Sequence, residues 1–120
     1  LFSGGNTYRT TAAIAGTTDD ALYQSERYGN FSYNVPVANG NYVVTLKFAE
    51  IYFSSAGMRA SDVLIEGAIV VSNLDMFAQV GRNTAHDVTV SVGVTDGMLN
   101  ITFRSLINNA KVSAIVIRTP

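Results

Sequence analysis

Two consecutive segments near the end of the chain alternate apolar and polar residues almost without exception. Residues 88–94 place valine at every second position, and residues 99–103 do the same with leucine, isoleucine and phenylalanine. A period of two residues is typical of a strand with one face on a core and the other toward water. Asp96-Gly97 lies between the segments and is a turn sequence. We therefore expect the two segments to pair as an antiparallel hairpin.

The same alternation begins a second stretch, residues 42–53, and then breaks. Apolar side chains share one face from Tyr42 to Phe48, after which Tyr52 and Phe53 stand side by side before a Ser-Ser-Ala-Gly loop. Neighbouring strand residues point to opposite faces, so at most one of these two rings could join the core face of the strand. We expect the pair to form a rim where aromatic faces can meet a ligand.

Turn residues and period predict further short strands. Asn39-Gly40 predicts a hairpin turn, because both residues accept a positive φ, and Glu66-Gly67 predicts a tight turn. Residues 112–117 are apolar on both faces, which predicts a central strand covered on both sides. The other predicted strands are 31–35, 42–48, 62–65 and 68–71, while residues 1–21, 57–61, 73–85 and 106–111 are expected to be loops or irregular.

Composition agrees with an all-β protein of the β-sandwich type. The 120 residues suit one domain, 1–120, with 48% hydrophobic residues and only 14% charged residues, against a usual value of about 25%. A net charge of −1 without a basic block argues against nucleic acid as a partner. No apolar run approaches the roughly 20 residues that span a bilayer. Without cysteine there is no disulfide framework and no thiolate metal site.

Catalytic and metal-binding patterns are weak. The single histidine, His86, precedes Asp87, but no Gly-x-Ser-x-Gly motif supplies a nucleophile, so we expect a structural role at the start of a strand. No spacing among the acidic residues singles out a glycosidase pair. Asp19-Asp20 is either half of a calcium site or a solvated turn or helix cap. These patterns single out no catalytic group and no cofactor site.

Aromatic residues carry the positive signal. Tyr28 stands beside Gly29, and Tyr52 and Phe53 end a strand, so strand period gives none of the three a clear core position. Sugar rings have apolar C–H faces that stack on aromatic rings, while their hydroxyls bond to polar side chains. The alternative is that one or two of the rings plug the end of the sandwich. The three together favour a carbohydrate site.

Four motifs resemble the malectin and malectin-like carbohydrate-binding domains. They are residues 23–29, Tyr-Gln-Ser-Glu-Arg-Tyr-Gly, residues 42–53, residues 83–87, Asn-Thr-Ala-His-Asp, and residues 109–115. They occur in the family's order over about residues 20–117. The resemblance implies a jelly-roll-type β-sandwich of two antiparallel sheets that binds glucose-containing oligosaccharides and has no catalytic activity.

The resemblance also implies a set of sugar-binding residues. In the family, aromatics from loops at one end of the sandwich and an acidic residue near the end of the chain hold the sugar. Tyr28 matches the tyrosine after the Glu-Arg pair, and Tyr52 and Phe53 match the loop pair. A further family aromatic near the start of the chain matches Phe2 best, and Tyr8 is the alternative.

Three departures from the family are visible. Asn108 replaces the family's aspartate, which removes a charge-assisted acceptor and puts malectin's particular disaccharide in question. Arg59-Ala60-Ser61 stands where the family has a bulky Val-Phe, and losing a buried ring costs about 3–5 kcal/mol if nothing fills the space. The family's opening strand precedes the stretch matched by Leu1-Phe2, so we expect an uncovered sheet edge and self-association through it, or an N-terminal segment that covers it.

Two functions are therefore carried forward. The first is a carbohydrate-binding module that recognises glucose-containing oligo- or polysaccharides with Tyr28, Tyr52, Phe53, Asn108 and Phe2. Such a module would be extracellular, as an accessory part of a larger secreted bacterial protein. The alternative is a protein-interaction or scaffold domain that has lost sugar binding. Neither function needs nucleic acid or membrane insertion.

Overall fold

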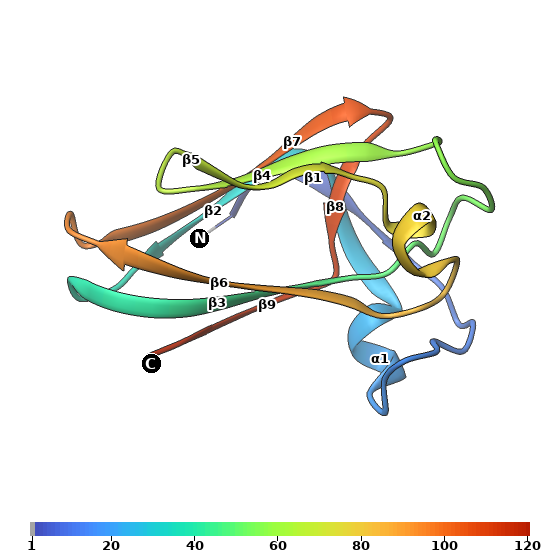
Figure 1. The fold of residues 1–120 in the computed structure, drawn as a ribbon, viewed down its shortest axis with the longest axis horizontal. Helices are drawn as coiled ribbons and strands as arrows, with labels where there is room; N and C mark the ends of the chain where they lie inside the picture. Colours follow the sequence, from blue (N-terminus) through green and yellow to red (C-terminus); the bar gives the residue numbers. More distant parts are fainter. Residues whose placement is uncertain (1) are drawn as a thin grey trace.

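Nine strands and two short helices follow one another in residues 2–120, which the computed structural model describes (Figure 1). In chain order they are β1 (Phe2–Arg9), α1 (Asp20–Tyr23), β2 (Ser25–Pro36), β3 (Gly40–Phe48), β4 (Ala60–Ile65), β5 (Ala68–Leu74), α2 (Met76–Val80), β6 (His86–Val94), β7 (Met98–Ile107), β8 (Ala110–Val112) and β9 (Ala114–Arg118).

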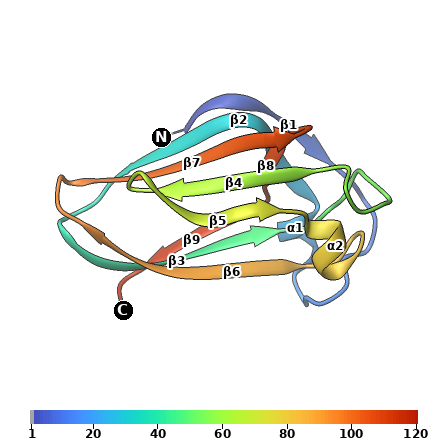
Figure 2. The same ribbon diagram turned by 45° about the horizontal axis from the view of Figure 1, so that its top comes forward.

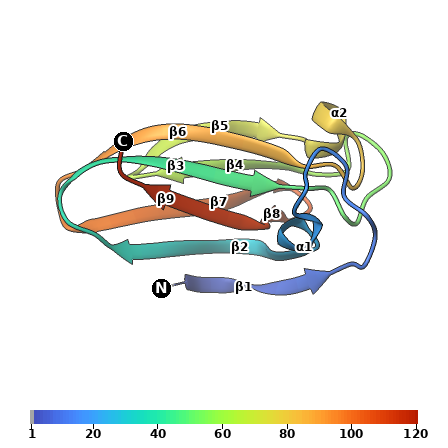
Figure 3. The same cartoon turned by 90° about the horizontal axis from the view of Figure 1, so that it is seen from below.

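The strands form two antiparallel sheets that pack face to face, which confirms the predicted all-β sandwich. The larger sheet has the order β1-β2-β7-β4-β5, with β8 paired to β2, and the smaller has the order β6-β3-β9. Figure 2 shows the larger sheet in this order, and Figure 3 shows β1 at its outer edge beside β2. The chain repeatedly crosses from one sheet to the other, as in a jelly roll.

The core lies between the sheets and is built from the alternating positions that the sequence singled out. Val44, Leu46 and Phe48 of β3 face Leu99, Ile101 and Phe103 of β7, and all six side chains are almost fully buried. Phe31 of β2 stacks on Phe103 with ring centroids 4.6 Å apart. Burying one such side chain contributes about 1.5–3 kcal/mol, so this layer fixes which faces of the strands point inward.

The predicted hairpin of residues 88–94 and 99–103 is wrong. β6 pairs with β3, while β7 pairs with β2 and β4, so Asp96-Gly97 joins two different sheets. Asn39-Gly40 likewise connects β2 of one sheet to β3 of the other, and is not a hairpin turn. Both connections are arches, in which the two apolar faces meet across the core instead of lying side by side. Glu66-Gly67, by contrast, does join the paired strands β4 and β5.

Residues 1–21 were expected to be loop, yet β1 is a strand of eight residues paired with β2. Its side chains are mostly exposed, so no apolar alternation marked it. A bulge lies between Gly4 and Asn6. A Cβ on Gly4 would stand 2.7 Å from the carbonyl oxygen of Asn30, so only glycine lets the two backbones approach this closely.

Residues 112–117 do not form one central strand. β8 belongs to the larger sheet and β9 to the smaller, with Ser113 at the crossing. β9 pairs only with β3 among residues 2–120, and Val116 on its outer face is 40% exposed. β9 is therefore an edge strand. Its apolar residues lie on both faces of the strand, and only one of these faces packs on the core.

Two further segments predicted as loop or irregular also contain regular structure. The segment 73–85 includes α2, which begins after Asp75, whose side chain accepts a hydrogen bond from the N–H of Ala78. The segment 106–111 holds the end of β7 and the start of β8. No helix among residues 2–120 is long and apolar enough to cross a membrane.

Candidate carbohydrate-binding site

A pocket of about 370 Å³ opens at the end of the sandwich where the long connections lie. It draws residues from both sides of the molecule: β1 and β2, the connection between β3 and β4, and the turn between β7 and β8. Its lining consists of four aromatic rings and four polar or charged side chains: Tyr8, Tyr28, Tyr52, Phe53, Glu26, Arg59, Asn108 and Asn109.

The aromatic wall is formed by rings that meet edge to face. Tyr52 is 56% exposed, and its ring centroid lies 5.0 Å from that of Phe53 and 5.5 Å from that of Tyr8. The interplanar angles of 84° and 86° are the favoured T-shaped arrangement. An exposed ring held by two neighbours keeps its face available to a sugar ring and loses little conformational entropy on binding.

Strand pairing places two charged residues, Glu26 and Lys111, beside this aromatic wall. Glu26 lines the pocket and forms its polar floor. Glu26 and Tyr28 are two residues apart on β2 and share one face. Tyr8 of β1 stands opposite Glu26, and Lys111 of β8 stands opposite Tyr28. The register of three strands thus gathers two tyrosines and a buried ion pair at one place.

Glu50 holds the aromatic pair in position from behind. Its Oε2 accepts hydrogen bonds from the backbone N–H groups of Tyr52 and Phe53, both at 3.2 Å. The side chain is 1% exposed. A buried carboxylate that caps two consecutive N–H groups fixes the backbone of the loop and, through it, the directions of both rings.

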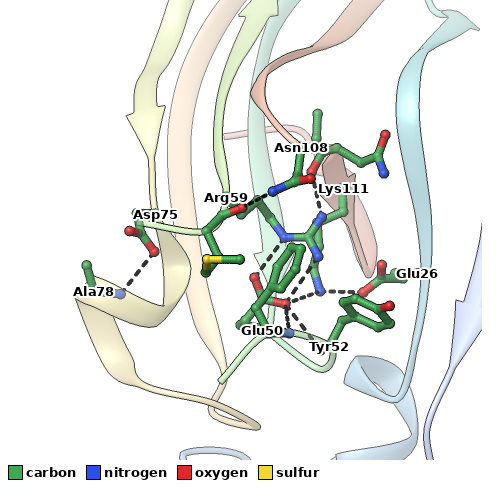
Figure 4. A network of polar contacts seen from close by, with 12 residues as sticks. Glu26, Glu50, Tyr52, Arg59, Asp75, Ala78, Asn108 and Lys111 are labelled. Atoms are coloured by element: carbon green, nitrogen blue, oxygen red, sulfur yellow. Dashed lines mark hydrogen bonds and ion pairs between the residues drawn. The ribbon is translucent and has the colours of Figure 1, made fainter. Parts of the chain in front are cut away.

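Arg59 ties this loop to the opposite wall of the pocket. Its Nε donates to Oε1 of Glu50 at 2.7 Å, and its Nη1 donates to the carbonyl oxygen of Asn109 at 2.6 Å. The guanidinium carbon lies 4.8 Å from the centroid of the Phe53 ring. One side chain therefore connects the aromatic loop, the Phe53 ring and the β7–β8 turn. Figure 4 shows Arg59 beside Glu50 in this network.

Lys111 completes a chain of four buried charges. Its Nζ pairs with Oε1 of Glu26 and lies 3.7 Å from Oε2 of Glu50. Burial lowers the pKa of Lys111, and burial likewise raises the pKa of Glu26, although Lys111 opposes that rise. Burial would also raise the pKa of Glu50, but the Arg59 hydrogen bond and the charges of Lys111 and Arg59 hold it below its ordinary value. Two acids and two bases leave the cluster neutral overall.

Asn108 stands at the rim in the left-handed region, with φ of 53°. Asparagine tolerates this backbone conformation better than most residues. Its Nδ2 donates to the carbonyl oxygen of Met58, so its Oδ1 is left as the acceptor that a ligand can use (Figure 4). An aspartate could not make the bond to Met58, because both groups would be acceptors.

Of the residues predicted for the site, Tyr28, Tyr52, Phe53 and Asn108 all line the pocket. Phe2 lies at the other end of β1, where its ring packs 6.3 Å from that of Tyr33 and under the guanidinium of Arg27 at 3.8 Å. Tyr8 is the residue of β1 that reaches the pocket.

Of the two acidic residues at the start of α1, Asp20 supports local structure, whereas the side chain of Asp19 makes no capping hydrogen bond. Asp19 occupies the position before the helix, and Oδ2 of Asp20 accepts the N–H of Ile14 at 3.1 Å. No group of three or more histidine or acidic side chains able to hold a metal ion occurs in the described part of the chain. His86 begins β6 opposite Phe48 of β3.

Glu26, Arg59 and Lys111 were missed as site residues. The only local signals were that Glu26 is two residues from Tyr28, and that Lys111 interrupts the apolar run around Ala110 and Val112. The partners Glu26 and Lys111 are separated by 85 residues, so their pairing depends on the sheet register.

Comparison with known proteins places the chain in one family. The Malectin domain family model matches residues 3–117. Malectin of Mus musculus is 44% identical over 86 residues, which are 69% of this chain and 30% of that protein. The chain thus spans less than a third of the length of this curated relative.

Solved structures with the same fold come from proteins of different kinds. A beta-glucuronidase of Bacteroides uniformis superposes with a TM-score of 0.88 over 99% of this chain and 14% of that chain, at 21% identity. The extracellular domain of ANXUR2 from Arabidopsis thaliana superposes with a TM-score of 0.85 over 98% of this chain and 40% of that chain, at 12% identity. At these identities the likeness is one of fold alone.

Proposed function

Because the chain belongs to the malectin domain family, we propose that it is a non-catalytic carbohydrate-binding module for glucose-containing oligo- or polysaccharides. The observation that carries this proposal is the pocket itself, in which an exposed and braced aromatic wall faces hydrogen-bonding groups. The ring face of Tyr52 would stack on the apolar face of a glucose unit. Tyr28 and Asn108 would bond its hydroxyls, and Phe53 would supply ring face only.

The proposed affinity follows from the shape of the site. The pocket is open, so a polar ligand loses only part of its hydration on binding and gains a limited apolar contact. A dissociation constant between micromolar and millimolar is expected, which is about −8 to −4 kcal/mol. Weak single sites of this kind suit a module that holds a larger protein near a polymer with many repeats.

Calorimetric titration with maltose, cellobiose and longer glucans tests the proposal. Tyr52→Ala should remove most of the binding while the melting temperature stays within a few degrees, because the side chain is 56% exposed. Phe2→Ala is the matched control, since Phe2 is an aromatic residue of the same exposure, 55%, outside the pocket. The control should bind like the parent protein.

Two results would count against a carbohydrate site. The first is a parent protein that gives no heat and no chemical-shift change with any glucan. The second is a Tyr52→Ala variant that unfolds, because the ring would then belong to the core. If both results were found together, the alternative of an interaction domain would take its place.

The proposed setting is extracellular, with the module as an accessory part of a larger secreted protein. The fold occurs in the extracellular domain of ANXUR2 and in a bacterial beta-glucuronidase, which supports such a setting for the fold. A bacterial parent protein that degrades polysaccharide remains our proposal. Immunodetection of the full-length protein in cell and medium fractions tests the location.

A second proposed function is self-association through β9. Its outer edge is unpaired among residues 2–120, and beside it lies an apolar groove of about 220 Å³ between β2 and β9. Ile115 and Ile117 line the groove, and the hydroxyl of Ser113 in its wall is buried without a hydrogen-bond partner. Unpaired edges recruit strands, so two copies would join β9 to β9. Light scattering should then show a dimer in the parent protein and a monomer in Val116→Lys.

A further inference from the structure

Only one of the two carboxylate oxygens of Glu26 accepts a hydrogen bond from the described chain, residues 2–120. Oε1 pairs with Nζ of Lys111. No hydrogen bond from another residue of the described chain, 2–120, reaches Oε2, although the residue is only 5% exposed and lines the pocket. An ionised carboxylate offers about four acceptor positions. The floor of the pocket therefore carries an acceptor that is almost buried and incompletely bonded.

Such an acceptor is costly unless something bonds it. Oε2 of Glu26 is not one of the buried side-chain atoms that lack a partner among residues 2–120, so it faces the pocket, and a carboxylate oxygen held there needs a bond from water or a ligand. Within the described residues, Lys111 is the one base that contacts Glu26, and Arg59 directs its bonds to Glu50 and Asn109. The remaining partner must come through the pocket, from solvent or from a ligand.

Neutralising Lys111 accounts for one oxygen of Glu26, because Glu50 is already paired with Arg59, but it leaves Oε2 of Glu26 without a role. Glu50 is a second carboxylate 3.7 Å from Nζ of Lys111 and is fully buried. The register sets Glu26 opposite Tyr8 and two residues from Tyr28, so its carboxylate lies among the rings of the proposed sugar site. A group that served only the ion pair would not need to line the pocket.

We propose that Glu26 is a ligand-contacting residue, whose Oε2 accepts a hydrogen bond from a hydroxyl of the bound sugar. This inference rests on the proposed carbohydrate function and adds to it. Lys111 holds the other oxygen and so positions the carboxylate. The charge-assisted acceptor that is absent at Asn108 is then supplied from the floor by Glu26.

The class of ligand follows from the charge of this acceptor. A carboxylate at the floor attracts neutral hydroxyl donors and repels the carboxylate of a uronic acid. The positive groups nearby, Lys111 and Arg59, are already paired with Glu26 and Glu50. The pocket therefore selects neutral glucosides that present a free hydroxyl at their inner edge. Glucuronic acid in place of glucose should weaken binding about tenfold or more.

Three variants separate contact with the ligand from support of the fold. Glu26→Gln and Lys111→Met each break the same ion pair, whereas the double variant Glu26→Gln/Lys111→Met removes both charges and leaves no unpaired one. The double variant should regain much of the lost melting temperature. Its affinity for maltose or cellobiose should stay lower than that of the parent by roughly tenfold to a hundredfold, the range expected for a bond to a charged group.

The outcomes distinguish this inference from the proposed function. A folded double variant that binds as tightly as the parent would overturn the role of Glu26 and leave the carbohydrate site intact. Equal or tighter binding of the glucuronic acid analogue would also overturn it. If the parent protein binds no glucan at all, the proposed function fails, and the inference about Glu26 fails with it.

Discussion

The two ends of the sandwich hold the connections between the sheets in different ways. At one end, short connections close the fold with backbone and small polar groups: the N–H of Val37 bonds the carbonyl of Gly97 at 3.1 Å, and the N–H of Gly97 bonds Oδ1 of Asn39 at 2.7 Å. At the other end, long connections are held by four buried charges. Figure 1 shows the short arches on the left and the long connections with α1 and α2 on the right.

The difference teaches where function can reside on this fold. The short turns satisfy their own polar groups and leave little for a ligand. The long connections present rings and acceptors, and the buried charges fix them in place. Buried ion pairs are weak contributors to net stability, but removing one partner is strongly destabilising. Such a cluster is better explained by the geometry it imposes on the pocket than by the stability it provides.

The largest contrast should come from one glutamate at each end. Glu50 is 1% exposed and bonds two N–H groups and Arg59, whereas Glu66 is partly exposed and accepts one bond from the N–H of Asn100. Glu50→Gln should lower the free energy of unfolding by about 3–5 kcal/mol. Glu66→Gln should lower it by less than about 1 kcal/mol. Urea unfolding of both variants measures the two changes in the free energy of unfolding. Equal losses at Glu50 and Glu66 would contradict the contrast between the two ends.

Acid should act on the pocket end through Glu50. Its pKa is lowered from an ordinary value of 4.5, so its contribution to stability is complete above that pH and is lost as pH falls through the lowered value. Arg104 and the N–H of Asn73 lower the pKa of Asp62 in the same sense. The difference in melting temperature between the parent and Glu50→Gln should therefore shrink below about pH 4.5. A difference that stays constant from pH 7 to pH 3 would contradict this account.

At the turn end, the sensitive position is a glycine. Gly97 has a φ of +74°, where a side chain is strained even though the nearest atom to an added Cβ is 3.8 Å away. Gly97→Ala should lower the free energy of unfolding by about 1 kcal/mol. Gly93 in β6 lacks the positive φ, so Gly93→Ala is the matched control and should be neutral or slightly stabilising. Equal effects at both glycines would show that conformation is not the cause.

The smallest expected effect is a gain. Ser61 is a buried residue near the start of β4, and its hydroxyl has no hydrogen-bond partner among residues 2–120. Ser61→Ala removes that unsatisfied group and should raise the free energy of unfolding by up to about 1 kcal/mol. Ser72→Ala on the exposed face of β5 should change it by less than about 0.5 kcal/mol. A loss of stability in Ser61→Ala would mean that a water bonds the hydroxyl.

How far the sequence could predict this molecule depends on the range of each interaction. Residues 88–94 and 99–103 were predicted correctly as strands, because apolar and polar residues alternate along each segment. Their pairing was predicted wrongly, because a hairpin and an arch leave the same alternation. β1 was missed because it pairs without burying side chains, so β2 defines it as a strand.

The candidate site divides in the same way. Tyr52 and Phe53 were predicted as rim residues because they break a local pattern in the connection that follows β3. Glu26 and Lys111 lie 85 residues apart, and only the register of β2 with β8 brings them together. The rings were therefore predictable, and the charges that hold them were not.

The most direct test of the central claim asks which end of the sandwich binds. Amide chemical shifts recorded during titration with maltose or cellobiose should move at Tyr52, Phe53 and Asn108. Those of Gly67 and Gly97 at the short turns should stay unchanged. Shifts confined to the pocket end would support the assignment of function to the long connections. Shifts centred on the short turns, or none at either end at millimolar sugar, would contradict it.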